Sequence, residues 1–167
     1  MTILNNKIYW LTWQAKKGFI FDLETFTKEK EFDYNKSPEG WGLTNNGKEL
    51  IKSDGSHKVW FLDPETLKEK RFIQAYTIDR AVDNLNELEL INGKLYANKY
   101  QKNTITIIDP NTGIVEGLAD LRGLEKEMKK THLLNVFQFY KPVERMVSLH
   151  QMLSHFFVTI LLMLLKK

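Results

Sequence analysis

Residues 39–48, Glu-Gly-Trp-Gly-Leu-Thr-Asn-Asn-Gly-Lys, lead to a second short motif, Asp-Pro-Glu-Thr, at residues 63–66. Asn46-Gly47 is typical of a tight hairpin whose central residues take a positive φ. The motif at 63–66 predicts a second turn, because its aspartate can accept hydrogen bonds from the following backbone and its proline fixes φ. Two short apolar runs separated by Asp54-Gly55 lie between these turns and predict another hairpin.

The same pair of turns occurs three times in the chain. The first turn recurs as Asn5-Asn6-Lys7 and Asn92-Gly93-Lys94, and the second recurs at residues 22–25 and 109–112. In every copy 16 positions separate the two turns, counted from Asn6 to Asp22, Gly47 to Asp63 and Gly93 to Asp109. A period of about 40–50 residues with four short strands per copy is typical of a β-propeller. We therefore predict an all-β propeller of four-stranded blades, with an ordinary meander sandwich as the alternative.

Runs rich in β-branched and aromatic residues, bounded by Gly, Asn and Asp, predict the strands of three blades. The first blade is expected to be incomplete, with residues 1–6 as the end of a strand running into a turn, so that the chain begins inside a repeat. Its further strands are expected at residues 7–13, 18–21 and 29–34. The second blade is expected to have strands at 39–44, 49–55, 58–62 and 69–73, and the third at 85–91, 94–98, 104–108 and 114–118. Residues 1–124 are thus predicted to form a partial propeller domain.

The repeat landmarks stop after residue 124, and residues 125–167 are predicted to form a degenerate tail that is irregular or helical. A short surface helix is expected at residues 123–130. Residues 146–165 are 20 positions without Asp, Glu, Lys or Arg, about the length of a membrane span. Polar residues interrupt the first half of that stretch, so a buried strand or helix is favoured over a membrane anchor. The first six residues have neither a basic segment nor a long apolar one, so no signal peptide is predicted.

The composition narrows the classes of function. The 167 residues include 24 Lys and Arg against 21 Asp and Glu, and the formal net charge is only +3. These charges are mixed along the chain, which argues against nucleic-acid binding. The absence of cysteine excludes disulfides, thiolate nucleophiles and cysteine-based metal sites, but it leaves the compartment open.

Propellers place ligand sites in the central channel, which is lined by the innermost strand of each blade. The predicted innermost strand at residues 85–91 carries polar side chains among apolar ones. Asn86 and Glu87 are expected on opposite faces, because strand side chains alternate. A polar side chain beside the channel needs a protein partner, a water molecule or a ligand. The alternative is that Asn86 and Glu89 only hydrogen-bond to neighbouring blades.

Several runs in combination resemble the plant and bacterial glutaminyl-peptide cyclotransferase family. The resemblance extends over residues 4–124. It rests on Leu-Thr-Trp-Gln at 11–14 with Gly-Phe at 18–19, residues 39–44, Ser-Asp-Gly at 53–55, residues 61–66, Asn-Leu-Asn-Glu-Leu-Glu at 84–89, residues 91–93 and Tyr-Ala-Asn at 96–98. It implies a five-bladed propeller that cyclises the N-terminal glutamine of peptides to pyroglutamate and releases ammonia. It also implies a reaction without a catalytic zinc or any other cofactor.

The resemblance further implies which residues form the site. Asn86 matches a catalytic asparagine of the family, and Trp41 matches a tryptophan of the substrate pocket. Tyr100 occupies a position where the family usually has tryptophan, and Glu87 and Glu89 lie beside Asn86 as substrate-binding residues. No metal-binding residues are implied.

Two further groups of the family have no counterpart in the chain. The family carboxylate comes from a Phe-Gly-Glu-Gly strand, and its lysine comes from a Thr-Gly-Lys strand. Residues 156–161, Phe-Phe-Val-Thr-Ile-Leu, resemble the second strand but lack its Gly-Lys. The chain is therefore expected to be a truncated member with about three of five blades, impaired in activity.

The expected function is that of an aminoacyltransferase whose partner is a peptide with N-terminal glutamine. The alternative is a non-catalytic propeller fragment that binds peptides or proteins, and a third possibility is a membrane-tethered version using residues 146–165. Three blades cannot close a ring, so self-association through the open blade edges is also expected. The family is often periplasmic or secreted, which leaves the compartment of this chain undecided.

Overall fold

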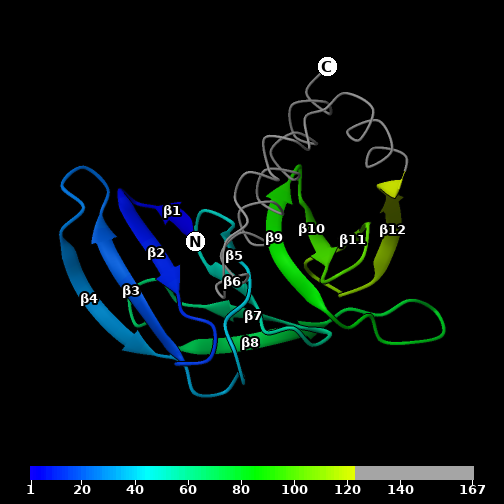
Figure 1. Cartoon of the computed structure of the whole chain (residues 1–167), viewed down its shortest axis with the longest axis horizontal. Coiled ribbons are helices and arrows are strands. Elements are labelled where there is room, and N and C mark those ends of the chain that lie inside the picture. Colours follow the sequence, from blue (N-terminus) through cyan, green and yellow to red (C-terminus); the bar gives the residue numbers. More distant parts are fainter. Residues whose placement is uncertain (123–167) are drawn as a thin grey trace, which may run out of the picture.

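The computed structural model describes residues 1–122, and these residues form three four-stranded antiparallel sheets (Figure 1). The first sheet consists of β1 (Thr2–Leu4), β2 (Lys7–Leu11), β3 (Lys17–Asp22) and β4 (Lys28–Asp33). The second consists of β5 (Leu43–Asn45), β6 (Leu50–Ser53), β7 (Lys58–Leu62) and β8 (Glu69–Gln74). The third consists of β9 (Leu85–Ile91), β10 (Lys94–Lys99), β11 (Thr104–Ile108) and β12 (Val115–Asp120). The predicted four-stranded blades are confirmed.

The three sheets are arranged as the blades of a propeller. The innermost strands β1, β5 and β9 face the middle of the view in Figure 1, whereas β4, β8 and β12 lie at the periphery. Asn45 Nδ2 donates to Thr2 Oγ1 over 2.7 Å and so links β5 to β1. Thr44 Oγ1 approaches Glu89 Oε2 to 3.5 Å on the other side, between β5 and β9. Side chains of the innermost strands from three blades therefore meet along one axis.

The first blade is a complete four-stranded sheet, and the strand end expected within residues 1–6 is its strand β1. Residues Thr2–Leu4 pair with β2 in the register Thr2↔Tyr9 and Leu4↔Lys7, so the prediction of an incomplete first blade was wrong. β1 is only three residues long, which is too short for a recognisable alternation of apolar and polar residues.

The second turn of the repeat has the same geometry in all three blades. The Oδ1 atom of each aspartate accepts hydrogen bonds from the backbone N–H groups two and three residues later, as at Asp63 with 2.9 and 2.8 Å. The residue four positions after the aspartate takes a left-handed φ, 56° at Phe26, 62° at Leu67 and 82° at Gly113. Its N–H returns to the aspartate carbonyl oxygen. The repeated aspartates thus shape turns, which explains their spacing without a catalytic role.

The first turn of the repeat varies between blades. Asn5 and Asn6 have φ of 51° and 59°, and Asn92 and Gly93 have 49° and 77°, as expected of two-residue hairpins. In the first turn of the second blade Gly47 has a positive φ but Asn46 does not, so the expectation for Asn46 was wrong. There the loop is longer, and Asn46 Oδ1 accepts hydrogen bonds from the backbone N–H groups of Lys48 and Glu49, at 2.9 and 2.6 Å.

Each interface between neighbouring blades is an apolar core. The first core joins blades one and two and contains Leu4, Tyr9, Leu11, Ile20, Phe32, Tyr34, Leu43, Leu50, Trp60, Leu62 and Leu67. The second joins blades two and three and includes Ile51, Val59, Phe61, Leu85, Leu88, Leu95 and Ile108. These cores fix the blades relative to one another, and so they also fix the loops at the ends of the channel.

The first blade carries apolar side chains on its other face as well. We call the set Ile3, Ile8, Trp10, Phe19 and Phe21 the open face of the first blade. Its members are cross-strand partners and therefore share one face of the sheet. Trp10 is 54% exposed, and its ring lies 6.2 Å from that of Phe21.

Several predictions concern residues outside the described part of the chain. The short helix at 123–130, the tail at 125–167 and the apolar stretch at 146–165 stay predictions, and so does the domain boundary after residue 124. Within residues 1–122, no helix is long and apolar enough to cross a membrane.

Candidate functional site

The connection between β4 and β5, residues 34–42, carries the first site residues. It was predicted to enter a strand at residue 39, but β5 begins at Leu43. Gly40 N–H donates instead to Trp13 O over 3.0 Å, and Trp41 N–H donates to Ser53 O over 3.1 Å. A side chain at residue 40 would come within 2.5 Å of the Tyr34 hydroxyl, so only glycine fits there. The connection is therefore held by backbone bonds to two blades.

A buried ion pair anchors the same connection. Lys52 Nζ lies 2.9 Å from Glu69 Oε1 and 3.8 Å from the centre of the Tyr34 ring, and it also donates to Ser37 Oγ. The backbone N–H of Lys36 donates to Glu69 Oε2 over 2.8 Å. Burial lowers the pKa of Lys52. Burial alone would raise the pKa of Glu69, but hydrogen bonds from Ser37 and Lys52 outweigh it, so the pKa of that carboxyl is lowered. The Lys52 side chain is fully buried, so we interpret Lys52 as a structural lysine.

Glu39 joins two tryptophans from different blades. Trp13, in the loop between β2 and β3, donates its indole Nε1–H to Glu39 Oε2 over 2.6 Å. Trp41 donates its indole Nε1–H to the same oxygen over 2.5 Å. Both are short, charge-assisted bonds, which fix the direction of each ring.

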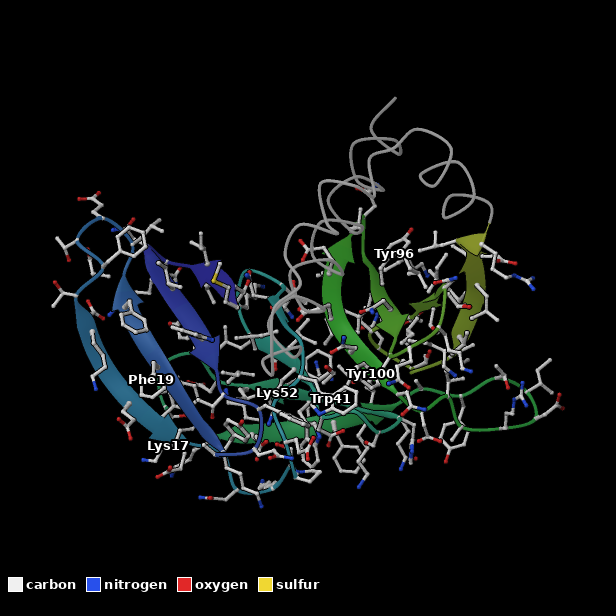
Figure 2. All side chains as sticks on the ribbon, in the orientation of Figure 1. Lys17, Phe19, Trp41, Lys52, Tyr96 and Tyr100 are labelled. Atoms are coloured by element: carbon white, nitrogen blue, oxygen red, sulfur yellow. The ribbon has the colours of Figure 1, made fainter. Side chains whose placement is uncertain are left out.

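Tyr100 completes this group from the third blade. Its ring meets that of Trp41 edge to face, with centroids 5.2 Å apart and an interplanar angle of 67° (Figure 2). The backbone places it there, because Tyr100 N–H donates to Asn84 O and Asn84 N–H donates to Gly55 O, both over 2.8 Å. Gly55 has φ of 81°, and a side chain on it would come within 2.5 Å of the Trp41 ring. We call Trp13, Trp41 and Tyr100 the aromatic wall.

Asn86 lies on β9, directly behind the segment that carries Trp41. Its backbone carbonyl accepts from Ser53 Oγ over 2.6 Å, and Ser53 Oγ in turn accepts from Gly42 N–H over 2.7 Å. The approach is so close that a side chain on Gly42 would overlap the Asn86 carbonyl oxygen. Asn86 is only 4% exposed, so its side-chain amide is largely removed from solvent. A buried amide needs hydrogen-bond partners, which a ligand or a water molecule can supply as well as the protein.

Glu87 is the second buried polar residue of β9. It is 6% exposed, and this burial raises the pKa of its carboxyl to about 7; the charge of Glu89 acts in the same direction, and the α-amino group of Met1 opposes them. A carboxyl that titrates near neutrality can accept and release protons at physiological pH. Glu89 is less buried, and its Oε2 lies within 3.5 Å of Thr44 Oγ1.

The expected strict alternation along β9 does not hold. The pairing of β9 with β10 changes register between Ala97↔Leu88 and Lys99↔Leu85. As a result Leu85 and Leu88, three positions apart, both lie in the core between blades two and three. A face assigned to Asn86 or Glu87 by counting residues is therefore unreliable across this irregularity.

The structure brings most of the predicted residues into one region. Trp41 and Tyr100 are in contact, and Asn86 is tied to the Trp41 segment through Ser53. Glu87 and Glu89 extend the region along β9, and their roles, like that of Asn86, stay predictions. Sequence analysis missed Glu39 and Trp13 as site residues, because 26 positions separate them and nothing local marks their contact. Within the described residues, no group of three or more His, Asp or Glu side chains is placed to hold a metal ion.

Comparisons with known proteins agree with this geometry. The family model of the glutamine cyclotransferases matches residues 1–159. A glutaminyl-peptide cyclotransferase of Arabidopsis thaliana is 35% identical over 132 residues, which are 78% of this chain and 41% of the relative. The crystal structure of Myxococcus xanthus glutaminyl cyclase superposes with a TM-score of 0.71 at 29% identity, covering 77% of this chain and 55% of that one. The chain thus spans about half the length of these two proteins. The match to the family model over nearly its whole length shows that the chain belongs to the glutamine cyclotransferase family.

Proposed function

We propose that this chain forms part of a site that converts the N-terminal glutamine of a peptide to pyroglutamate. In this reaction the α-amino nitrogen attacks the side-chain amide carbon, a new C–N bond closes the ring, and the bond to the amide nitrogen breaks as ammonia leaves. The observation that carries the proposal is that buried Asn86 is held directly behind the Trp41 segment, beside the aromatic wall. Membership of the glutamine cyclotransferase family supports it.

Asn86 is suited to stabilise charge in the transition state. As the amine attacks, the amide oxygen of the substrate becomes an oxyanion, and the Asn86 Nδ2–H group can donate to it. Loss of one such donor typically lowers the rate by about 10²–10³-fold. Because the reaction is intramolecular, it also gains from any surface that holds the glutamine side chain folded back on the amine. The aromatic wall provides such a surface.

The reaction also needs a group that takes a proton from the attacking amine, and an asparagine cannot do so. The family resemblance assigns this role to a Phe-Gly-Glu-Gly strand, which the 167 residues do not contain. We therefore expect the chain alone to cyclise glutamine at or near the uncatalysed rate. Burial raises the pKa of Glu87 to about 7, which makes Glu87 the first candidate for this role within the chain.

The test is ammonia release from a glutaminyl tripeptide, measured with three proteins. These are the 167-residue chain, a fusion that adds the Phe-Gly-Glu-Gly and Thr-Gly-Lys strands of a family member, and the same fusion with Asn86→Ala. We expect turnover only in the unsubstituted fusion, with most of the gain lost on Asn86→Ala. Strong turnover by the chain alone would contradict the expectation, and its loss on Glu87→Gln would then identify Glu87 as the proton acceptor.

A non-catalytic peptide-binding module is the second candidate function. The observation in its favour is that the described residues hold the aromatic wall and Asn86 together, so the proposed peptide-binding surface lies within residues 1–122. Calorimetry with the same tripeptide distinguishes the two functions. Binding by the fusion without any ammonia release would support the binding module.

We propose in addition that the open face of the first blade mediates association. Ile3 and Trp10 are each 54% exposed on that face, and exposed apolar surface of this kind favours contact with another protein surface. In the 167-residue chain the partner is a second copy of the chain. Sizing chromatography over a range of concentrations tests this, and a monomer at every concentration would contradict it.

A further inference from the structure

We propose that Glu39 is a positioning residue that fixes Trp13 and Trp41 as a preformed wall for the amino-terminal residue of a peptide. This inference rests on the proposed function, because it concerns how the same site receives its substrate. It starts from one carboxylate oxygen, Glu39 Oε2, that accepts both indole N–H groups at 2.6 and 2.5 Å.

The chain contains a second tryptophan–carboxylate bond that serves as a structural comparison. Trp60 donates its indole Nε1–H to Asp54 Oδ2 over 2.7 Å, but Trp60 is only 6% exposed and lies in the core between blades one and two. Packing alone fixes the Trp60 ring, and the bond satisfies a buried donor. The bond to Asp54 is therefore explained by stability.

The two bonds to Glu39 have a different setting. Trp13 is 39% exposed, and Trp41 and Glu39 are also accessible in part. A half-exposed indole has a water molecule available for its N–H group and gains little stability from a protein acceptor. What the shared acceptor supplies is direction, because it holds rings from two different blades in one fixed arrangement.

Fixed rings favour binding because the peptide does not have to order them. Each flexible side chain that is immobilised on association costs about 0.5–1.5 kcal/mol, and a preformed wall avoids that cost. Tyr100 is also 39% exposed and meets Trp41 edge to face, so its contact depends on the orientation that Glu39 gives to Trp41. The carboxylate and the electron-rich ring faces together make the wall negative in potential, which suits the free amino end of a peptide.

The test compares Glu39→Leu, which removes the acceptor, with Glu39→Gln, which keeps an acceptor oxygen of the same reach. Glu65→Leu is the matched control, because Glu65 is an exposed glutamate in the turn between β7 and β8. The 167-residue chain is used throughout. It contains four tryptophans, so its ¹H–¹⁵N spectrum has four indole signals, which Trp→Phe variants assign.

In Glu39→Leu we expect the indole signals of Trp13 and Trp41 to move together and their N–H protons to exchange with water at least about tenfold faster. The Trp60 signal should stay in place and show that the fold is intact. Affinity for a glutaminyl tripeptide, measured by calorimetry, should fall by about tenfold and return to within about threefold of the original in Glu39→Gln. Glu65→Leu should change neither the indole signals and their exchange rates nor the affinity for the tripeptide.

Two results would overturn the inference. The first is an unchanged pair of indole signals in Glu39→Leu, since Glu39 would then not hold the rings. The second is a tripeptide affinity that is undetectable in the unsubstituted chain or indifferent to Glu39, since the wall would then not receive the peptide. If the fusion with the two family strands bound the tripeptide in a Glu39-dependent way but released no ammonia, the role of Glu39 would stand. Only the proposed cyclisation activity would then be contradicted.

Discussion

Replacing Glu87 by glutamine is expected to change how the stability of the chain depends on pH. Glutamine has the shape of a protonated glutamate but cannot ionise. Burial raises the pKa of Glu87 to about 7 in the folded chain, whereas the unfolded chain has the ordinary value of 4.5. Between these two pH values the folded chain binds more protons than the unfolded chain at this residue. The free energy of unfolding must therefore decrease as the pH rises through that range.

The size of the effect follows from the two pKa values. A difference of one pH unit corresponds to about 1.4 kcal/mol, so the interval from 4.5 to about 7 corresponds to about 3 kcal/mol. The stabilising contribution of protonated Glu87 is complete below pH 4.5 and is lost as the pH rises through 7. Glu87→Gln should therefore match the original chain in acid and exceed its stability by about 3 kcal/mol at about pH 8.

Urea unfolding followed by tryptophan fluorescence, at several pH values between about 4 and 8, measures this difference. Glu65→Gln is the control, since that exposed glutamate should give a curve parallel to the original. A difference between Glu87→Gln and the original chain that is constant over the whole range would refute the reasoning. It would mean that Glu87 has the same pKa in the folded and unfolded chains.

Two further substitutions test the packing that supports the site, and a third tests the proposed self-association. Gly42→Ala should lower the free energy of unfolding, measured by urea titration, by about 1–3 kcal/mol, because the new methyl group overlaps the backbone of β9. The control Gly117→Ala should be nearly neutral, because a methyl group fits at that position. Lys52→Met should cost about 3–5 kcal/mol in the same assay by leaving Glu69 buried without its partner, and a loss under 1 kcal/mol would show that the pair is not ionised. Trp10→Ser should reduce self-association in sizing chromatography, whereas Ile78→Ser, on a distant exposed loop, should not.

The fold could be predicted from the sequence because the signals of the repeat are local. Each aspartate of the second turn bonds to backbone groups within the next three residues, so its effect is complete within the motif that shows it. The spacing between turns then sets the lengths of the strands between them. The three-residue strand β1 was predicted only as the end of a strand in an incomplete blade, and the loop at Asn46 differed from expectation. Neither feature depends on a sequence pattern long enough to be informative.

Only part of the candidate site could be predicted from the sequence. Trp41, Tyr100 and Asn86 could be named because they lie in recognisable motifs, and the structure places all three in one region. The bond from Trp13 to Glu39 crosses from one blade to the next, and no local pattern could indicate it.

By itself, the sequence of this chain determined the number of blades, the positions of most strands and the residue types around the channel, because turn chemistry and side-chain alternation act over a few residues. Only the tertiary structure decided which of those residues meet and how they titrate. Glu39 becomes a shared acceptor because two blades bring Trp13 and Trp41 to it. Glu87 acquires a pKa of about 7 because packing between the innermost strands removes its carboxyl from water. Both properties depend on distances between segments far apart in the chain, and folding alone sets those distances.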